Sequence, residues 1–315
     1  MVVLEARDRI GGRVWSTEVG GVAVDLGASW IHGTDGNPLS ELAARAGVVP
    51  VVTDDDSVVV RDRAGEVWST DELVGPSALA EVESLVDDGL AGGDLVADDT
   101  VAAVIEAEWG EEDPYLLDVV VTTLIGHEYA ADPDELAVLA LLEGEGFDGD
   151  DAILPGGYRL LLDPLAAGVE VRLDTPVRTV ARDASGVTVT TAAGEGLVAD
   201  AAVVTLPLGV LQSGAVAFDP PLPAAHRAAI ESLGMGVLDK VVLVFEDAFW
   251  GPDPHVVVLL PEQPGRFVAW VNLLPLVGVP ALMGFNSGST ARALEDLDDE
   301  QVVADALAAL RAARA

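Results

Sequence analysis

The chain has 315 residues, half of them hydrophobic, so it can form two modest domains with cores of their own. Its net charge of −38 disfavours binding to nucleic acid or anionic membranes and attracts cations. The absence of cysteine in this chain excludes disulfides, thiolate catalysis and cysteine-ligated metals. Salt adaptation or genomic base composition is the stronger explanation of the acidity, so the charge carries little functional weight.

The N-terminal part mixes short apolar runs with turn signals. Asn37-Pro38 opens a helix, with the proline in its first turn, and Gly47 ends it. The predicted strands are Val2–Leu4, as the end of a buried parallel strand, Gly21–Asp25, and Ser57–Val60 with Glu66–Ser69 as a hairpin around Arg61–Gly65.

The middle of the chain, from about Asp71 to Leu142, has apolar residues at three- and four-residue spacing and is predicted to be helical. The helices named by this spacing are Thr100–Trp109, Pro114–Gly126 and Pro133–Leu142. A loop is expected over Gly144–Gly157. This acidic block reads as an insertion between two strand-rich parts.

The C-terminal half is predicted to alternate between helices and strands, which favours a mixed α/β protein. The expected helices are Tyr158–Ala167, Ala224–Leu233 and Asp299–Arg314. The expected strands are Glu170–Leu173, Val177–Arg182, Val187–Thr191, a buried strand at Val198–Thr205, and a second sheet from Val237–Phe245, His255–Leu260, Arg266–Leu273 and Ala281–Phe285.

One uncharged stretch, Phe267–Phe285, has the length of a membrane span. Its two prolines and two glycines would break a spanning helix, so two buried strands joined by a turn are the better prediction. The N-terminus MVVLEARDR does not have the pattern of a signal peptide. We therefore expect a soluble, cytoplasmic protein without a membrane partner.

The most specific segment is LEARDRIGGRVWST, from Leu4 to Thr17. A carboxylate at the end of a strand, here Glu5, accepts hydrogen bonds from ribose hydroxyls in dinucleotide-binding folds. Gly11 and Gly12 allow the backbone to approach a pyrophosphate closely, and Arg13 supplies a charge-assisted donor to it. This string resembles the second strand and diglycine motif of the flavin amine oxidase family, which includes polyamine oxidases, monoamine oxidases and histone lysine demethylases.

The next segment, VDLGASWIHGTDGNPL (Val24–Leu39), is similar to the flavin-contacting loop of that family. The match implies that Ser29 and Trp30 lie beside the flavin. The WIHG wording resembles polyamine and spermine oxidases most, where the matching histidine lies near the substrate. His32 is therefore a candidate substrate contact; a structural histidine in a loop is an equally good reading.

The resemblance continues over nearly the whole chain and is weakest across Asp71–Leu142. LPGGYRLLLDPLAAGVEVRLDTPV resembles the stretch that leads to an FAD-contacting valine, here Val177. GMGVLDKVVLVFEDAFW contains Lys240, the only lysine of the chain. The matching lysine in the family bonds, through a water, to the reactive ring nitrogen of the flavin, and the planar fork of arginine does not replace an ammonium there.

The resemblance implies a two-domain FAD-dependent amine oxidase fold with an incomplete Rossmann-type FAD domain and a substrate domain of sheet and helices. The expected FAD domain covers residues 1–46 and 154–207, and the expected substrate domain covers 47–153 and 208–315. The implied site residues are Lys240 as the catalytic residue, Glu5, Arg7, Gly11, Gly12, Arg13, Gly27, Ala28, Ser29, Trp30 and Val177 for FAD, and His32 for substrate. The implied partners are an amine of polyamine type and dioxygen, with hydrogen peroxide as a product.

The chain departs from the family at both ends. A G-x-G-x-x-G loop is expected about 20 residues before the ribose ligand, and only four residues precede Glu5. The flavin-contacting C-terminal segment of the family is not found after Arg314. A fragment that binds no FAD, or a related desaturase or protoporphyrinogen oxidase, are the alternative predictions.

Two other kinds of chemistry find no support in the sequence. The four histidines show no ligand spacing, so no metal site is predicted. A Ser-His-Asp triad lacks a nucleophile-elbow motif. The sequence indicates neither the particular amine nor the oligomeric state.

Overall fold

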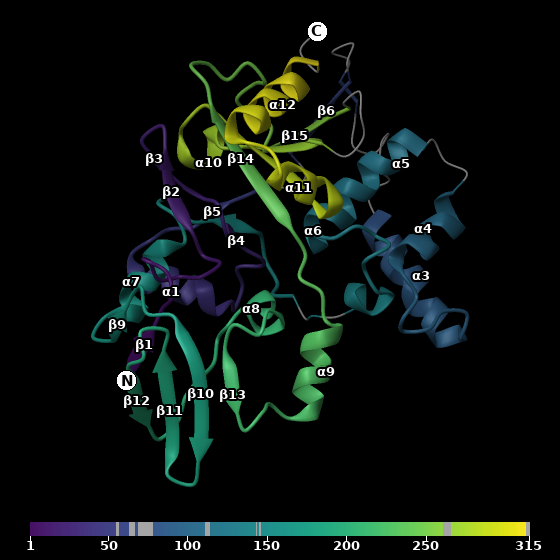
Figure 1. The fold of residues 1–315 in the computed structure, drawn as a ribbon. Coiled ribbons are helices and arrows are strands. Elements are labelled where there is room, and N and C mark those ends of the chain that lie inside the picture. The colour runs from purple at the N-terminus through teal and green to yellow at the C-terminus, as the bar shows by residue number, and fades with distance from the viewer. Residues whose placement is uncertain are drawn as a thin grey trace. The chain divides into compact units, whose positions relative to one another are not determined.

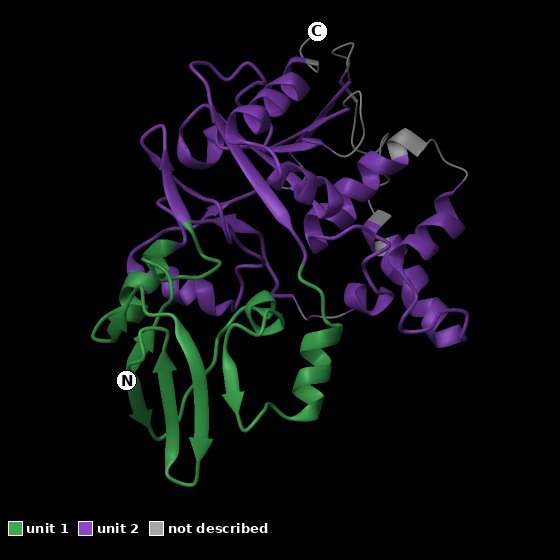
Figure 2. Ribbon diagram, in the orientation of Figure 1, with its two compact units in different colours: residues 1–15, 159–235 green, residues 16–158, 236–315 purple. Residues whose placement is uncertain are grey.

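The computed structural model describes residues 1–54, 57–62, 67–68, 78–110, 114–142, 144, 146–260 and 266–312. Helices and strands alternate along the chain, which confirms the mixed α/β class (Figure 1). The chain divides into two compact units (Figure 2): residues 1–15 with 159–235, and residues 16–158 with 236–315. The boundaries of these units differ from those predicted for the FAD and substrate domains. The predicted domains were defined by function, and their bounds stay a prediction.

Unit 1 is built around two small sheets. Strand β1 (Val2–Leu4) pairs in parallel with β9 (Glu170–Arg172). A four-stranded sheet has the order β12-β11-β10-β13, with bounds Gly196–Ala199, Gly186–Thr191, Val177–Asp183 and Ala217–Asp219. The helices of this unit are α7 (Arg159–Ala166), α8 (Leu208–Gln212) and α9 (Ala224–Ser232).

Two expectations for unit 1 are wrong. The strand predicted at Val198–Thr205 ends at Ala199, and Val203 is 90% exposed rather than buried. Residues 200–206 pair with no strand of the described part of the chain, and an apolar composition cannot replace a hydrogen-bonding neighbour. Strand β1 is parallel as expected, but its first two valines are exposed because only β9 pairs with it there.

Unit 2 contains the largest described sheet, of order β14-β17-β16-β15-β6-β7. The bounds in that order are Leu238–Val244, Ala281–Ser287, Ala269–Asn272, Val256–Leu259, Val58–Arg61 and Val67–Trp68. The predicted hairpin pairs as β6 with β7, while its residues 63–66 and 69 lie outside the described residues. Two smaller sheets are β2-β3 (Ser16–Val19, Val22–Asp25) and β4-β8-β5 (Trp30–Ile31, Ala152–Ile153, Val51–Val52).

The first helix of unit 2 follows the local sequence signals. Helix α1 (Pro38–Ala46) is capped by the side chain of Asn37 and ends at Gly47, which has a positive φ of 72°. The other described helices are α3 (Ala78–Gly92), α4 (Val101–Trp109), α5 (Pro114–Val121), the π-helical turn η1 (Thr122–Gly126), α6 (His127–Tyr129), the 3-10 turn η2 (Val138–Leu142), α10 (Leu274–Val277), α11 (Gly288–Glu295) and α12 (Asp299–Ala312).

Two expectations fail at the edges of this helical block, whose predicted start at residues 71–77 lies outside the described residues. Only Val138–Leu142 of the helix predicted at Pro133–Leu142 is helical, because Leu136 O and Val138 N bond to the backbone around the start of α4 instead. The loop predicted at Gly144–Gly157 contains β8, which pairs with both β4 and β5.

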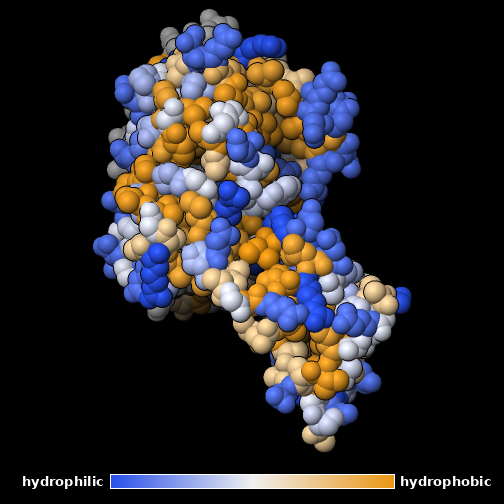
Figure 3. Space-filling model, turned by 90° about the vertical axis from the view of Figure 1, so that its left-hand side faces the viewer, coloured by the Kyte–Doolittle hydropathy of each residue, from blue (hydrophilic) through white to orange (hydrophobic). Residues whose placement is uncertain are grey.

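The uncharged stretch Phe267–Phe285 forms β16 and β17, joined through the short helix α10, as expected of two buried strands. Among the described helices, none is both long and apolar enough to cross a membrane. Apolar and hydrophilic residues are interleaved on the face drawn in Figure 3, as is usual for a protein surface.

Strand β17 is buried on both faces, and its alternation directs side chains to two different cores. Leu282 packs with Trp270 and with Leu294 and Leu310 of the C-terminal helices. Ala281, Met283 and Phe285 pack on the opposite side, in the core that includes Val24, Ile153 and Trp30. This second face carries the side chains that matter for the candidate site.

Candidate functional site

Lys240 lies in strand β14, directly opposite Phe285 of β17 in the antiparallel register. Its Nζ donates hydrogen bonds to the carbonyl oxygen of Gly27 and to the hydroxyl oxygen of Ser29, each at 2.5 Å. The same nitrogen lies 5.5 Å from the centre of the Trp30 ring and 5.8 Å from that of Phe285, within range of a cation–π attraction. The only lysine of the chain is therefore held against the predicted flavin-contacting loop.

Burial lowers the pKa of the Lys240 ammonium to about 8, while the charge of Asp25 opposes this shift. A lysine with a pKa near the working pH can both give up and take back a proton. The structure thus gives Lys240 an acid–base capacity that an exposed lysine lacks.

The side chain of Asp25 anchors the start of the loop that runs from β3 to Trp30. Its carboxylate, on a residue only 8% exposed, accepts hydrogen bonds from the hydroxyl of Ser16 and, at 3.1 Å to each oxygen, from the backbone N–H of Tyr158. Burial raises the pKa of Asp25; the bonds from Ser16 and Tyr158 and the charge of Lys240 act in the opposite direction. The buried carboxylate holds the end of β3 where the loop to Trp30 begins.

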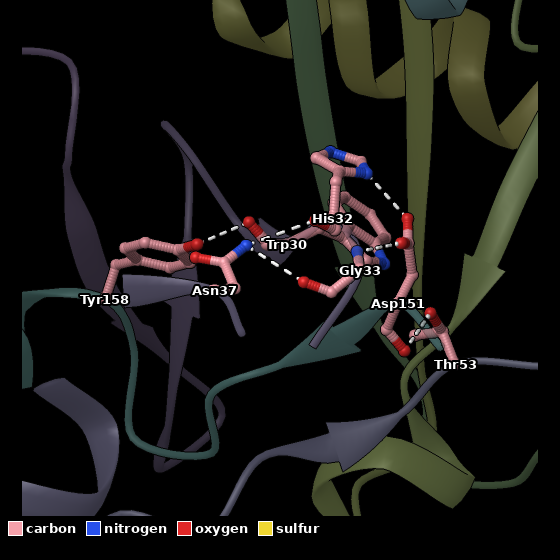
Figure 4. Close-up of polar contacts among 7 residues, drawn as sticks. All are labelled: Trp30, His32, Gly33, Asn37, Thr53, Asp151 and Tyr158. Carbon is pink, nitrogen blue, oxygen red and sulfur yellow. Dashed lines mark hydrogen bonds and ion pairs between the residues drawn. The ribbon is translucent and has the colours of Figure 1, made fainter. Parts of the chain in front are cut away.

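Tyr158 ties the other end of the loop, because its hydroxyl donates to the carbonyl oxygen of Trp30 (Figure 4). Burial, with the charges of Asp25 and Asp151, raises the pKa of Tyr158 to about 12, so this phenol stays protonated and remains a donor. The Trp30 ring lies 6.0 Å from the Phe285 ring. The indole is therefore fixed both by its backbone and by an aromatic neighbour.

His32, two residues further, is exposed and pairs with Asp151. Its Nδ1 lies 2.6 Å from Asp151 Oδ2, and the N–H of Gly33 donates to Asp151 Oδ1 at 2.8 Å. The side chain of Asn37 donates to the carbonyl oxygens of His32 and Gly33 at 3.2 and 2.9 Å. Figure 4 shows these contacts, which fix the loop after Trp30.

The diglycine segment lies in unit 1, and its two glycines differ. Both have positive φ, 104° at Gly11 and 56° at Gly12. A Cβ on Gly11 would lie 2.6 Å from Val14 O, whereas a Cβ on Gly12 would meet nothing within 4 Å. Gly11 therefore serves the turn, and Gly12 leaves its backbone open to a ligand.

Two arginines flank the diglycine turn with different roles. The guanidinium of Arg9 donates to the carbonyl oxygens of Ile10, Gly12 and Val14 at 3.0–3.3 Å and lies 4.9 Å from the Trp15 ring. Arg13 is exposed and forms no hydrogen bond or ion pair with the described residues. Arg9 thus shapes the turn, and Arg13 presents its charge to solvent.

The other predicted residues of unit 1 lie near the strand ends. One carboxylate oxygen of Glu5 accepts the N–H of the exposed Arg7 at 2.8 Å, directly after β1. Val177 begins β10 and is half-buried. Of the loop residues in unit 2, Gly27 is half-buried, Ala28 exposed and Ser29 buried.

The predicted residues thus form two groups. Unit 1 contains Glu5, Arg7, Gly11, Gly12, Arg13 and Val177, and unit 2 contains Gly27, Ala28, Ser29, Trp30, His32 and Lys240. The structure joins Lys240 to Ser29 by a hydrogen bond and places its Nζ 5.5 Å from the centre of the Trp30 ring. Sequence reasoning missed Arg9, Asp25, Asp151, Tyr158 and Phe285. Asp25 was detectable as a carboxylate that ends an apolar strand, and Arg9 as a charge beside the glycines.

Comparison with known proteins identifies the relationship. The family model described as flavin containing amine oxidoreductase matches residues 1–91 and 110–315. The chain belongs to this family. It is 32% identical to polyamine oxidase 3 of Oryza sativa subsp. japonica over 99% of this chain and 68% of the relative, and 30% identical to polyamine oxidase 4 of the same plant over 96% and 66%. The chain spans about two thirds of the length of these curated relatives.

Solved structures agree on the fold of this flavin-containing family. Putrescine oxidase aligns with a TM-score of 0.75 over 99% of this chain and 75% of that chain, at 22% identity. The comparison confirms the expected amine oxidase fold. Lysine-specific histone demethylase 2 of Homo sapiens, 28% identical over 99% of this chain and 40% of its own length, also matches.

Membership in the family implies FAD as the cofactor, and the residues of this chain fit one. The open backbone at Gly12 and the solvent-facing Arg13 are groups that could bind a pyrophosphate. Glu5 supplies an acceptor at the end of a parallel strand, where ribose hydroxyls are bound in such folds. Each of these features lies in unit 1.

Proposed function

We propose that the protein containing this chain oxidises amines with FAD as the electron acceptor. When bound, FAD supplies the acceptor for a hydride from the carbon next to the amine nitrogen, and dioxygen then takes up the electrons to give hydrogen peroxide. The imine hydrolyses to an aldehyde and a smaller amine. The family match and the buried Lys240 beside Ser29 and Trp30 support this proposal.

Within each unit, the proposed cofactor-binding residues have separate roles. Glu5 would hold the ribose, Gly12 and Arg13 the pyrophosphate, and Val177 the adenine side, with Gly11 and Arg7 maintaining the turn around them. Gly27, Ala28, Ser29 and Trp30 would line the ring system. Charge-assisted donors and an open backbone are the groups that a pyrophosphate requires.

Lys240 is proposed as the catalytic residue. Its ammonium would hold a water and pass a proton near the reacting ring. Burial has already lowered its pKa to about 8, so moving a proton to or from this nitrogen costs little near neutral pH. Ser29 and the carbonyl oxygen of Gly27 keep the nitrogen in place through the cycle.

The substrate class is proposed to be a polyamine. The WIHG loop and the acidic composition support it, as do relatives named polyamine oxidases. His32, exposed and two residues after Trp30, would contact the substrate. Dioxygen is the proposed second substrate.

The experiment is an anaerobic titration of the full-length protein with amines, followed by absorbance of the flavin and by peroxide release in air. Spermine or spermidine should bleach the flavin faster than tyramine or benzylamine. The reverse order would reject the polyamine class and retain amine oxidation. A flavin that no amine reduces would reject the proposed activity itself.

A further inference from the structure

Asp151 is held by hydrogen bonds at its backbone carbonyl and at both of its carboxylate oxygens. It directly precedes β8, and its backbone carbonyl accepts the N–H of Thr53 at 2.8 Å and the Thr53 hydroxyl at 3.1 Å. Its two carboxylate oxygens accept from different partners, Oδ1 from the N–H of Gly33 and Oδ2 from the His32 ring (Figure 4). The side chain is thus held at both of its oxygens.

The contact between His32 Nδ1 and the Asp151 carboxylate determines which ring nitrogen of a neutral His32 carries the proton. An ionised carboxylate accepts hydrogen bonds and donates none, so the imidazole must be protonated on Nδ1. Nε2 then carries a lone pair and can accept a hydrogen bond. No described residue bonds to Nε2, and the His32 side chain is 70% exposed. The acceptor therefore faces outward and is available to a ligand.

The position of His32 along the chain relates it to the lysine site. Ile31 of β4 is fully buried, so Trp30 and His32 flank a residue that points inward. Two residues of extended chain span about 7 Å. The Trp30 ring lies 5.5 Å from Lys240 Nζ. His32 therefore lies about one such span along the chain from the residue that contacts Lys240.

We propose that Asp151 is a positioning residue for recognition of a second, non-reacting ammonium group of a di- or polyamine. Asp151 fixes the tautomer of His32 so that Nε2 accepts a hydrogen bond from that ammonium, and its negative charge adds to the attraction. A monoamine has no group to place there. The inference rests on the proposed function and names the feature that would select its substrate class.

The first experiment tests the tautomer without reference to activity. Asp151→Asn retains an oxygen for the Gly33 N–H and places an NH₂ donor against His32 Nδ1, which forces the proton to Nε2. The 15N shifts of selectively labelled histidine, measured at alkaline pH, should report Nδ1–H in the wild type and Nε2–H in Asp151→Asn. Asp151→Glu should retain the Nδ1–H form. A wild type with the proton on Nε2 would overturn the proposal whatever the enzyme does.

The second experiment measures selectivity. Asp151→Asn should raise KM for spermidine by about tenfold, the loss expected for one charge-assisted hydrogen bond, with kcat nearly unchanged and KM for benzylamine unchanged. The matched control is Asp150→Asn, which removes the same charge from the exposed neighbouring residue. In a His32→Ala background, Asp151→Asn should have a much smaller effect, that of the lost charge alone.

The outcomes separate the inference from the proposed function. An equal rise of KM for both amines, or a full effect of Asp151→Asn without His32, would overturn the positioning role. A protein that shows the tautomer change and oxidises no amine would instead reject the proposed activity, and with it the role assigned to the dyad.

Discussion

The ammonium nitrogen of Lys240 lies 2.5 Å from the hydroxyl oxygen of Ser29, although 211 positions separate the two residues. Strand β14 and the loop after β3 bring them together, and the rings of Trp30 and Phe285 lie within cation–π range of the lysine nitrogen. Two separate sequence motifs thus meet at one nitrogen. The contact gives the lysine a defined position and, by burial, a lowered pKa.

Lys240→Met should slow reduction of the flavin by amine on the order of 10²-fold while FAD remains bound, because the variant loses an acid–base group but none of the proposed phosphate contacts. Stopped-flow absorbance of the full-length protein measures the rate. Lys240→Arg is the control, since it keeps a charge but is not expected to restore the rate. Reduction at the wild-type rate in Lys240→Met would remove the lysine from the mechanism.

The same residue should give the stability a distinct pH dependence. Its pKa is lowered from 10.5 to about 8 by burial, so between these values the unfolded chain binds more protons than the folded protein. The free energy of unfolding contributed by Lys240 therefore rises as pH rises through this window. Relative to Lys240→Met, the wild type should gain about 3 kcal/mol between pH 8 and pH 10.5. Urea denaturation of both proteins across the window measures the difference, and a flat difference would contradict the buried ammonium.

Local signals in the sequence predicted the elements that depend on local chemistry. Asn37, Pro38 and Gly47 predicted the bounds of α1 because caps and positive φ act within a few residues. Short runs of apolar residues likewise predicted β14 and β17. These signals need no knowledge of the partner element.

The features that were missed depend on contacts distant in sequence. Asp151 lies 119 positions from His32, and nothing in either segment names the other. The strand expected at Val198–Thr205 failed because its apolar residues specify a preference for burial but not a pairing neighbour. The site motifs were predicted through family resemblance, while the hydrogen bonds between Asp25 and Tyr158 that hold them, 133 positions apart, required the fold.

Substitutions at Arg13 and Arg9 should affect different properties, FAD binding in the first case and stability of the turn in the second. Arg13→Ala should weaken FAD binding by about tenfold or more, because it removes a charged donor, with the free energy of unfolding changed by less than about 0.5 kcal/mol. Arg9→Ala, in contrast, should lower the melting temperature, because three carbonyl oxygens of the turn lose their hydrogen-bond donor. Flavin fluorescence titration and thermal unfolding measure the two effects. A stability loss in Arg13→Ala equal to that in Arg9→Ala would contradict the division of roles.

Alanine substitutions at the two glycines of the turn can be compared directly, because the two positions differ in the space around the new Cβ. In Gly11→Ala the new Cβ would lie 2.6 Å from the backbone oxygen of Val14 and 2.7 Å from Leu162 Cδ1, so the turn must move. In Gly12→Ala the Cβ meets nothing within 4 Å, and only the positive φ of 56° is strained, at a cost of about 1 kcal/mol. Gly11→Ala should therefore destabilise the protein by several times more than Gly12→Ala.

FAD binding should respond differently to the same two changes. Gly12→Ala adds a methyl group on the open side of the backbone, where the pyrophosphate is proposed to approach, so FAD affinity should fall more than the small stability loss explains. Denaturation of the FAD-free protein gives the stability, and equilibrium titration with FAD gives the affinity. An unchanged affinity in Gly12→Ala would mean that the pyrophosphate does not approach this backbone, while the structural role of Gly11 would still stand on its own measurement.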